Sequence, residues 1–489
     1  MIVARAMTAA RAAQSRWSRT PLTRRLELVR ALRRLIADSA SDLAEASASA
    51  RRRPALEALT AEVLPLAEAC RFLEREAKKI LAPRRLGRRG RPLWFAGVRG
   101  EIWREPVGVV LIIGPGNYPL LLPGVQLIQA IAAGNAVLLK PGMGGTSAAR
   151  ALGGLMVRAG FDPQLVGLLP ESAEFARVAI LARPDKVLFT GSAATGEKIL
   201  AQLAPQLIPA TMELSGCDAM LIRADADLNL VVRALTFGLT LNGGATCMSP
   251  KRVFVHRNLS AELAGRLARH FRLGRDEDAP AVQGKNQNRF PAATGYVRLL
   301  IEDAVGRGAH FIAGDESADA PVILGGVAPA SRLLREDVFA PVLALVSVSN
   351  DHEAVMRVND CAFGLTASVF SRDESAARSL AGRLNAGVVT INDLILPTAD
   401  ARVPFGGRGR SGFGVTRGAE GLLELTAPKV VTVSRGKFRP AFDPPQPGDE
   451  TLFKAYLKLT HGRGLKPRWI AFISLLRSMA HRLKSPPYQ

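Results

Sequence analysis

Hydrophobic and polar residues follow two successive patterns along this chain. Over residues 8–80, long segments rich in alanine, leucine and arginine contain few breakers, and apolar residues such as Leu26, Val29 and Leu32 recur at helical spacing. From Pro106 onward, short apolar runs alternate with helical segments. This alternation is typical of a parallel sheet with helices packed on its faces. The sequence therefore predicts a helical region followed by a doubly wound α/β region.

The α/β region begins with Val107–Ile113, an almost purely apolar run of the kind expected for a parallel strand covered on both faces. The further expected strands are Ala136–Leu139, Leu165–Leu169 and Lys186–Phe189. The expected helices are Pro123–Ala133, Ala148–Arg158, Ala173–Leu181 and Glu197–Leu203. Right-handed crossovers between such strands build a Rossmann-like sheet.

A second α/β stretch runs from about Glu213 to about Arg410. Upstream of both stretches, residues 83–99 break the helical pattern with glycine, proline and clustered arginine, which predicts a loop or an extended arm. The remaining expected elements are a polar surface loop at Asp276–Asn288, a short strand at Val430–Val433 and a proline-rich linker at Pro440–Gly448. The sequence shows no internal repeat.

The composition is that of an ordinary globular protein, with 48% apolar and 22% charged residues in a chain of 489. Of the net charge of +22, residues 1–100 carry +13 and residues 434–489 carry +8, so the part between them is nearly neutral. A nucleic-acid enzyme is more often basic around its working site, and we expect no specific nucleic-acid partner. The four cysteines form no CxxC pair, which predicts neither a disulfide framework nor a metal site. A reduced, cytoplasmic location is the expectation.

No apolar run reaches the ~20 residues that cross a bilayer. The segment Lys466–Lys484 instead has an amphipathic pattern. It joins an apolar face of Trp469, Phe472, Ile473 and Leu476 to the basic residues Arg468, Arg477, Arg482 and Lys484. A basic amphipathic segment of this kind can lie peripherally on an anionic membrane surface. Docking on the protein's own body or on a second copy is the alternative.

Cys247 is a candidate nucleophile in the segment NGGATC (residues 242–247). The preceding Ala234–Leu241 has the pattern of a buried helix, which the glycines interrupt. A thiol on a glycine-rich turn is accessible, and nearby backbone N–H groups can stabilise a thiolate or an oxyanion. Free cysteines are also among the most buried residues, so this segment alone leaves a nucleophile and a core thiol open.

Glu213 and Asn117 are two further polar candidates. Glu213 is flanked by apolar residues in TMELSG, where a carboxylate is either a general base with a raised pKa or a surface residue at a strand end. Asn117 directly follows a buried strand, which is where open α/β sheets place ligand-binding loops. Its amide can donate to a developing oxyanion, although asparagine is also common in turns.

Two glycine-containing loops follow expected strands. Gly114 and Gly116 give a partial Gly-x-Gly whose third position is Pro119, so the ordinary dinucleotide fingerprint is absent. The segment Gly191–Gly196 (GSAATG) follows a strand and opens a helix. Free N–H groups and the helix dipole favour a phosphate at such a point.

Taken together and in this order, these segments resemble the aldehyde dehydrogenase superfamily. The matching pieces are GPGNYP (114–119), AAGNAVLLKPG (132–142), VLFTGSAATG (187–196), MELSG (212–216), NGGATC (242–247), EDVFAPV (336–342) and PFGGRGRSGFG (404–414). The compact N-terminus and the C-terminal extension are most similar to the class that oxidises fatty and aromatic aldehydes. The resemblance implies a Rossmann-like cofactor domain, an α/β catalytic domain and a β-arm for oligomerisation.

The resemblance also implies a division of the chain into domains. The expected parts are the N-terminal helices of the cofactor-binding domain (1–83), an arm or hairpin (84–106), the dinucleotide-binding domain (107–212), the catalytic domain (213–410), a return to the cofactor domain with an oligomerisation strand (411–433) and a basic C-terminal extension (434–489). A homo-oligomer is implied, with a dimer favoured.

By this resemblance the protein oxidises an aldehyde, of a long-chain or aromatic kind, to a carboxylate with NAD or NADP. Cys247 would attack the aldehyde carbon, Asn117 and the Cys247 N–H would hold the resulting oxyanion, and Glu213 would activate the water that hydrolyses the thioester. The implied cofactor-binding residues are Ile113, Pro115, Lys140, Gly191, Ser192, Gly196, Asp337 and Phe339.

The chain departs from the family pattern at several positions. Gly116 stands where tryptophan is usual, which predicts a wider substrate tunnel or a looser loop. Cys217 stands where the glutamate motif normally has lysine. Met143 occupies a position where members restricted to NAD often carry glutamate, so we expect NADP to be tolerated.

Two other functions remain open at this point. One is a CoA- or phosphate-dependent acyl reductase on the same fold, which would keep Cys247 but would not need Glu213 as a water activator. The other is a catalytically weak relative that serves as a membrane-surface or protein-binding scaffold.

Overall fold

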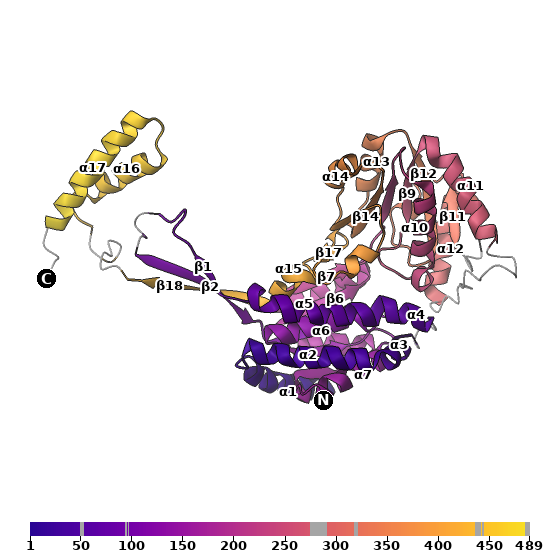
Figure 1. Ribbon diagram of the computed structural model, residues 1–489, viewed down its shortest axis with the longest axis horizontal. Helices are drawn as coiled ribbons and strands as arrows, with labels where there is room; N and C mark the ends of the chain where they lie inside the picture. Colours follow the sequence, from indigo (N-terminus) through magenta and orange to yellow (C-terminus); the bar gives the residue numbers. More distant parts are fainter. Residues whose placement is uncertain are drawn as a thin grey trace. The chain divides into compact units, whose positions relative to one another are not determined.

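The structure, a computed structural model, describes residues 1–48, 53–92, 95, 97–273, 291–316, 321–435, 442 and 445–484. The surface loop expected at 276–288 lies outside these residues, as does part of the expected linker. The chain divides into two units (Figure 1). The first unit comprises Met1–Pro83 with Trp103–Lys429, and the second comprises Arg84–Ile102 with Val430–Gln489.

The first unit contains a six-stranded sheet with the order β17-β7-β6-β3-β4-β5. Its strands are β3 (Val109–Ile113), β4 (Ala136–Lys140), β5 (Val166–Leu168), β6 (Lys186–Gly191), β7 (Ala210–Leu214) and β17 (Gly412–Phe413). All neighbours pair in parallel except β17, which is antiparallel to β7. Every residue of β3 and β4 is buried, because helices cover both faces. The predicted α/β fold class is confirmed.

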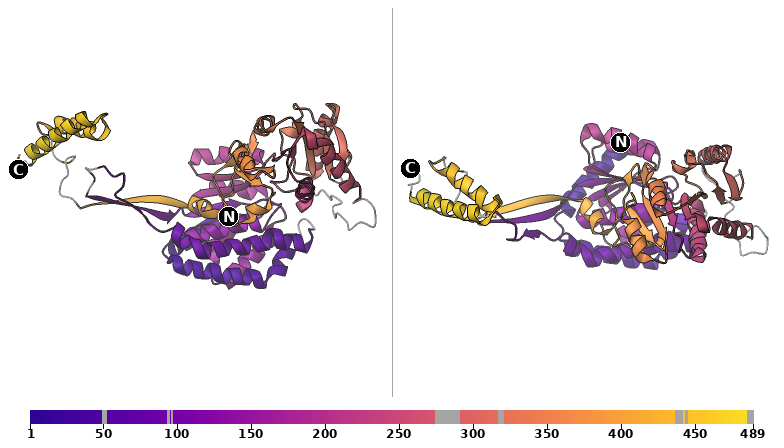
Figure 2. Two further views of the ribbon diagram at one scale, coloured as in Figure 1. Left: turned by 45° about the horizontal axis from the view of Figure 1, so that its top comes forward. Right: turned by 90° about the horizontal axis from the view of Figure 1, so that it is seen from above.

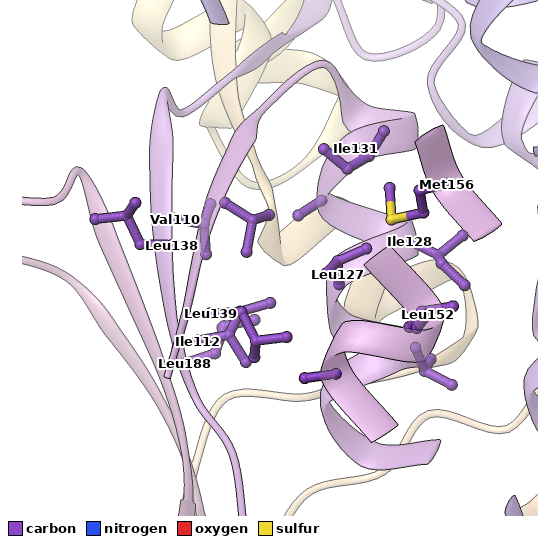
Figure 3. Packing of buried hydrophobic residues seen from close by; sticks show 14 of the residues in the cluster. Val110, Ile112, Leu127, Ile128, Ile131, Leu138, Leu139, Leu152, Met156 and Leu188 are labelled. Atoms are coloured by element: carbon purple, nitrogen blue, oxygen red, sulfur yellow. The ribbon is translucent and has the colours of Figure 1, made fainter. Parts of the chain in front are cut away.

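Helices connect these strands and bury the apolar residues on them. They are α6 (Leu121–Ala133), α7 (Thr146–Arg158), α8 (Ala173–Leu181) and α9 (Ala193–Leu203). Ile112 lies opposite Leu139 on one neighbouring strand and Leu188 on the other. Figure 3 shows these three side chains on the side that faces Leu127 and Ile131 of α6. Each such side chain contributes about 1.5–3 kcal/mol when it is fully buried.

Helix α9 begins at Ala193, four residues before the expected start at Glu197. The reason is a cap, since the Ser192 side chain accepts a hydrogen bond from the Thr195 N–H at 3.3 Å. The glycine-containing segment 191–196 is therefore the end of β6 and the first turn of α9, and it forms no separate loop.

The N-terminal helices share the hydrophobic core of the six-stranded sheet. They are α1 (Ile2–Trp17), α2 (Leu22–Asp38), α3 (Ala40–Ala48), α4 (Ala55–Ala58), a π-helical turn at Leu59–Val63 and α5 (Leu64–Ile80). Helices α2 and α5 run side by side, as Figures 1 and 2 show. The chain returns to the same core after the second sheet, where α15 (Gly418–Glu424) buries Leu422.

The first unit also contains a seven-stranded sheet with the order β10-β11-β12-β9-β8-β14-β15. Its strands are β8 (Ala219–Ile222), β9 (Arg252–His256), β10 (His310–Ala313), β11 (Val322–Gly325), β12 (Val342–Val348), β14 (Thr366–Phe370) and β15 (Val388–Ile391). The helices around it are α10 (Leu228–Thr240), α11 (Arg257–Leu273), α12 (Pro291–Gly306), α13 (Asp351–Asn359) and α14 (Glu374–Ala381). Successive residues of β8 enter different apolar clusters, Met220 on one face and Leu221 on the other.

The second unit includes most of an exposed ribbon and a helical hairpin. The ribbon is a three-stranded sheet, in the order β1-β2-β18, of β1 (Arg84–Leu86), β2 (Val98–Pro106) and β18 (Thr426–Ser434). Helices α16 (Asp449–His461) and α17 (Leu465–Lys484) pack against each other around Leu452, Tyr456 and Leu475. Of the helices that the structure describes, none combines the length and the apolar character needed to span a membrane.

Candidate active site

Cys247 lies at the junction of two cavities in the first unit. One is an apolar pocket of about 730 Å³, lined on its other sides by residues such as Leu121, Phe237 and Phe405. The other is a cleft of about 1230 Å³, lined by Asn117, Glu213 and residues from the ends of β6 and β7. The three predicted catalytic side chains, Asn117, Glu213 and Cys247, line the cleft together. Cys247 also lines the apolar pocket.

The turn before Cys247 requires left-handed backbone conformations. Asn242, Gly243 and Gly244 have φ values of 53°, 61° and 77°. A Cβ on Gly244 would also lie 2.4 Å from the Pro341 nitrogen, so only glycine fits there. The Asn242 side chain fixes the turn by donating to the Asn117 carbonyl at 3.0 Å. These contacts end α10 and project Cys247 away from the helix.

Asn117 is hydrogen-bonded to the loop that carries Cys247. Its amide nitrogen donates to the Ala245 carbonyl at 3.2 Å, and its Oδ1 accepts from the Tyr118 N–H at 3.0 Å. The Tyr118 hydroxyl shares a 2.6 Å hydrogen bond with Thr246 Oγ1. An asparagine side-chain amide has two N–H donors, and the contact with Ala245 uses one of them.

A buried ion pair stabilises the start of α6, directly after the Asn117 loop. Glu62 is fully buried, pairs with Arg53, and accepts hydrogen bonds from the N–H groups of Leu120 and Leu121 at 2.7 and 3.0 Å. These N–H groups belong to the start of α6, where a negative charge is favoured. Sequence reasoning missed this support, because Glu62 lies in an ordinary helical pattern far from the motifs.

Glu213 lies near the end of β7, with one carboxylate oxygen bound and the other without a partner among the described residues. Its Oε2 accepts a 3.1 Å hydrogen bond from the Thr416 hydroxyl, while the buried Oε1 has no hydrogen bond. Burial raises the pKa of Glu213, and the nearby Arg417 cation partly opposes this. A carboxylate with a raised pKa and an unused oxygen, in the cleft that Cys247 also lines, is suited to accept a proton from water.

Arg417 is a site residue that sequence reasoning missed. It lines the apolar pocket, its Nη1 donates to the Thr398 carbonyl at 2.5 Å, and its guanidinium lies 5.0 Å from the centre of the Phe405 ring. Burial and the Glu213 carboxylate raise the pKa of the Cys247 thiol, while the Arg417 cation lowers it. Its sequence signal is weak, because Arg417 stands among other charged residues of the same segment, such as Glu420 and Glu424.

Replacing Arg417 by methionine is expected to move the pH dependence of the reaction to higher pH. Loss of the cation raises the pKa of both Cys247 and Glu213, so both groups ionise at higher pH than in the wild type. We expect kcat/KM at pH 7 to fall roughly tenfold, which corresponds to ~1.4 kcal/mol. The measurement is the pH profile of kcat/KM together with that of Cys247 alkylation. Arg417→Lys keeps the charge and should restore the wild-type profile; equal profiles for the two variants would contradict this role.

The cleft has the features needed for a dinucleotide. Pro115, Gly191, Ser192, Asp337 and Phe339 line it, and the N-terminus of α9 opens at Ser192. A helix N-terminus of this kind presents free N–H groups to a phosphate. Asp337 is hydrogen-bonded to the Ser215 hydroxyl, and burial raises the pKa of Asp337.

Three of the predicted cofactor-binding residues are not among those that line the cleft. Ile113 and Lys140 pair with each other at the ends of β3 and β4, and neither lines the cleft. Gly196 is buried in α9, where an added Cβ would lie 2.7 Å from the Leu214 side chain, so glycine there permits helix–strand packing.

The expected effect of Gly116 on the substrate tunnel differs from what the structure shows. Gly116 lines the cleft and is absent from the lining of the apolar pocket. An added Cβ would lie 2.9 Å from the Met143 carbonyl, so the loop around Gly116 is closely packed against the loop after β4. Glycine here allows two backbones to approach each other.

Glu171 is a second residue that sequence reasoning missed. Its Oε2 accepts hydrogen bonds from the Gly144 N–H at 3.0 Å and from the Thr146 hydroxyl at 2.9 Å. Burial lowers the pKa of Lys140, and the Glu171 carboxylate opposes that shift. A carboxylate from a different segment thus lies near Lys140, although Met143 provides none.

These features define a class of protein: an α/β enzyme with a cysteine thiol between a dinucleotide-type cleft and an apolar pocket. Comparison with known proteins gives the family, since the model of the aldehyde dehydrogenase family matches residues 2–431. The chain belongs to the aldehyde dehydrogenase family. It is an oxidoreductase that acts on aldehydes with NAD or NADP.

Several relatives and solved structures resemble most of the chain. A 4,4'-diapolycopene aldehyde oxidase of Methylomonas sp. is 31% identical, covering 94% of this chain and 87% of the relative. A putative succinate-semialdehyde dehydrogenase [NADP(+)] of Mycolicibacterium smegmatis is 31% identical, covering 88% and 84%. The crystal structure of an aldehyde dehydrogenase from Brucella melitensis biovar abortus has a TM-score of 0.81 at 27% identity, covering 89% and 90%. That of a Staphylococcus aureus betaine aldehyde dehydrogenase in complex with NAD+ has a TM-score of 0.80 at 25% identity, covering 91% and 89%.

Proposed function

We propose that this enzyme oxidises an uncharged, apolar aldehyde to a carboxylate through a thioester on Cys247. The observation that carries the proposal is the position of Cys247, which lines both the apolar pocket and the cleft. An aldehyde chain in the pocket would bring its carbonyl carbon to the thiol, and cleft residues such as Ser192, Asp337 and Phe339 would hold a nicotinamide dinucleotide beside it. Holding the reactants in this way supplies much of the catalysis.

The first step is the attack of the Cys247 sulfur on the aldehyde carbon. Burial raises the pKa of the thiol, so its proton must pass to solvent in the cleft as the sulfur attacks. The oxygen of the resulting thiohemiacetal is held by the second N–H of the Asn117 amide and by the Cys247 backbone N–H. When bound in the cleft, the nicotinamide supplies the hydride acceptor.

The second step is hydrolysis of the thioester. Glu213 accepts a proton from water at Oε1, the oxygen that has no hydrogen bond, while Thr416 holds Oε2 in place. The water oxygen then attacks the thioester carbon, and the sulfur of Cys247 leaves and regains its proton. An acyl reductase using CoA or phosphate would not need this unpartnered oxygen, so Glu213 favours hydrolysis. A catalytically weak scaffold would not need the Asn117, Glu213 and Cys247 side chains to meet.

The apolar pocket supports an uncharged substrate. Arg417 is the only charged residue among the described residues around the pocket, and its guanidinium already contacts the Thr398 carbonyl and the Phe405 ring.

The test is a NAD(P)H-production screen with aldehydes of graded chain length, aromatic aldehydes and succinate semialdehyde, run beside Cys247→Ala. We expect kcat/KM to rise roughly three- to fourfold per added methylene, as ~0.8 kcal/mol per buried CH₂ predicts. A preference for the charged semialdehyde would contradict the proposal.

We predict that NADP is accepted within about a hundredfold of NAD in kcat/KM, a difference of ~2.7 kcal/mol. Met143 provides no carboxylate against a 2′-phosphate, but Glu171 lies near Lys140 and is attached to the same loop. Glu171→Gln should therefore shift the ratio of kcat/KM toward NADP by about tenfold, or ~1.4 kcal/mol. The control is Glu174→Gln, an exposed residue in the first turn of α8. An unchanged ratio in Glu171→Gln would remove Glu171 from cofactor selection.

The helical hairpin α16–α17 supports a proposal of peripheral contact with an anionic lipid bilayer. Trp469, Phe472, Leu476 and Met479 are exposed on one side of α17, and the Trp469 and Phe472 rings lie 5.7 Å apart. The predicted face differs at Ile473, which is half-buried. Exposed basic residues, including Lys466, Arg468 and Arg477, flank this face. The combination of apolar and basic side chains fits an anionic membrane surface.

Deleting residues 440–489 is expected to abolish sedimentation of the enzyme with vesicles that contain anionic phospholipid. Trp469→Glu with Leu476→Glu should weaken sedimentation to a similar extent, because both side chains are exposed and their loss does not disturb the hairpin core. Lys454→Glu, on the other helix of the hairpin, is the matched charge control. Unchanged binding of the deleted chain would show that the hairpin is not the anchor, and binding of a second protein copy by the hairpin would overturn the lipid proposal.

A homodimer and a cytoplasmic location remain predictions. Strand β18 is an edge of the three-stranded ribbon, and most of its residues, including Val430 and Val433, are exposed. An exposed edge strand is a template for pairing with another chain. We propose a second copy of this protein as that partner, and light scattering of the full-length enzyme in solution measures it.

A further inference from the structure

Two cysteines from distant parts of the sequence meet behind the active site. Cys217 lies between β7, which carries Glu213, and β8. Cys361 lies between α13 and the two-residue strand β13 (Phe363–Gly364). The two thiols are hydrogen-bonded to each other, and both are free cysteines. The proposed catalytic steps use neither of them.

The backbone on both sides of this thiol pair is fixed by Arg252 and Asp218. Arg252 Nε donates to the Cys217 carbonyl at 2.8 Å, and its Nη1 donates to the Val358 carbonyl at 3.1 Å. Asp218 Oδ1 accepts from the Thr366 N–H at 2.8 Å. The two chain segments are therefore held side by side before and after the sulfur atoms, so the contact between the thiols follows from buried backbone interactions.

The two sulfur atoms have different environments. Cys361 is half-buried, its sulfur accepts a hydrogen bond from the Phe363 N–H, and Arg252 and Arg335 lie close enough to favour its thiolate. The hydrogen bond from Cys217 is the largest cause of a pKa of about 6 for Cys361. Cys217 is fully buried, and the contact with Cys361 together with burial raises its pKa. The surroundings of Cys361 thus favour its thiolate, and its partner is a buried, protonated thiol.

We propose that Cys361 and Cys217 form a peroxide-reactive dithiol, in which a hydroperoxide oxidises Cys361 and Cys217 then closes an intramolecular disulfide. The Cys361 thiolate attacks one peroxide oxygen, the O–O bond breaks, and the leaving oxygen departs as hydroxide, which takes a proton to become water. The Cys217 sulfur then attacks the sulfur of the Cys361 sulfenic acid. Its thiol proton leaves with the sulfenic hydroxyl as a second water, and the S–S bond forms.

Peroxide oxidises this thiol pair before it oxidises Cys247, the proposed nucleophile for the aldehyde. Burial and the Glu213 charge raise the pKa of Cys247, so Cys247 is protonated at neutral pH and reacts slowly with peroxide. The dithiol accepts the two-electron oxidation first, and a dithiol reductant of small molecular size restores it. The Ser411 hydroxyl links the Cys217 segment, which includes the cleft residue Ser215, to the Cys361 segment. Its Oγ donates to the Ser215 carbonyl at 2.8 Å and accepts from the Gly364 N–H at 3.1 Å.

The test is to treat the reduced full-length enzyme with one equivalent of hydrogen peroxide and to map its thiols by mass spectrometry without reduction. We expect a cross-linked peptide that contains Cys217 and Cys361, while Cys247 and Cys70 still react with an alkylating reagent after unfolding. In Cys217→Ser, Cys361 should instead be trapped as a sulfenic acid by dimedone. In Cys361→Ser, peroxide consumption at pH 7 should fall at least about tenfold, and Cys247 should become the first thiol lost.

Cys70→Ser is the control, because Cys70 is a fully buried thiol in a different core; it should leave the cross-link unchanged. The peroxide rate of the wild type should fall as the pH drops through about 6, where the Cys361 thiolate takes up a proton. The proposal is overturned if Cys247 is oxidised before either member of the pair, or if wild-type Cys361 remains a sulfenic acid beside a free Cys217. Neither outcome depends on which aldehyde the enzyme uses, so the test is separate from that of the proposed function.

Discussion

The Cys247→Ala enzyme should produce NAD(P)H from any aldehyde at least about 10⁴-fold more slowly than the wild type, since loss of the nucleophile of a covalent mechanism costs on the order of 10⁶ in kcat in a protease. The reason is that no other described thiol lines the cleft or the apolar pocket. Without the sulfur, the aldehyde carbon cannot become tetrahedral and cannot release a hydride. The measurement is the steady-state rate of cofactor reduction with a saturating apolar aldehyde.

Two comparisons make this result specific to the thiol. Cys361→Ser removes a sulfur that touches neither the pocket nor the cleft, and under reducing conditions it should keep the wild-type rate. The melting temperature of Cys247→Ala should stay close to that of the wild type, because the substitution removes one sulfur at the edge of a cavity. Turnover in Cys247→Ala within tenfold of the wild-type rate would show that the proposed covalent route is wrong.

The Glu213→Gln enzyme should show one rapid turnover per subunit followed by a rate reduced by about 10²–10⁴-fold, the range that a general base contributes. Hydride release does not require the water activator, so the first equivalent of NAD(P)H forms and the acyl group stays on Cys247. Glutamine fits the same space and keeps an oxygen for Thr416, but it cannot take a proton from water. Rapid-mixing kinetics measure the burst, and intact-protein mass spectrometry measures the trapped acyl group.

The pH dependence of the second step provides an independent check. Burial raises the pKa of Glu213, so the carboxylate is ionised only above that raised value. Hydrolysis in the wild type should therefore rise as the pH increases through the pKa, whereas Glu213→Gln should lose this dependence. Adding CoA or inorganic phosphate should leave the wild-type rate unchanged. If either compound accelerates turnover of the wild type and accepts the acyl group, the alternative function of an acyl reductase replaces hydrolysis.

Much of the architecture could be predicted from local patterns. The apolar runs that predicted β3, β4 and β6 are buried strands, and the helical periodicities between them are α6, α7 and α8. The errors lie at boundaries that depend on hydrogen bonds. The α9 start moved to Ala193 because Ser192 caps the helix, and the C-terminal strand extends over Thr426–Ser434 because it pairs with β2 in the ribbon.

The candidate site also contains residues that the sequence predicted and residues that only the structure identified. Cys247, Glu213 and Asn117 could be singled out because each stands at the end of a predicted element in a distinctive local sequence. Arg417, Thr416 and Glu171 could not, because their surroundings in the sequence are unremarkable and their importance depends on which atoms they face. Gly116 is a different case. Comparison with the family pattern predicted an effect on the substrate tunnel, but the structure packs Gly116 against the Met143 carbonyl.

The sequence by itself determined the alternation of strands and helices, the family and the three residues proposed to carry the chemistry, because these depend on residue type and short-range spacing. Only the tertiary structure decided that Cys247 opens into both an apolar pocket and a cleft, and that Glu213 keeps one oxygen without a partner. It also decided that Cys217 touches Cys361, although 143 residues lie between them. The physical reason is that burial, charge and hydrogen bonding act through space, and parallel strands bring together residues that are far apart along the chain.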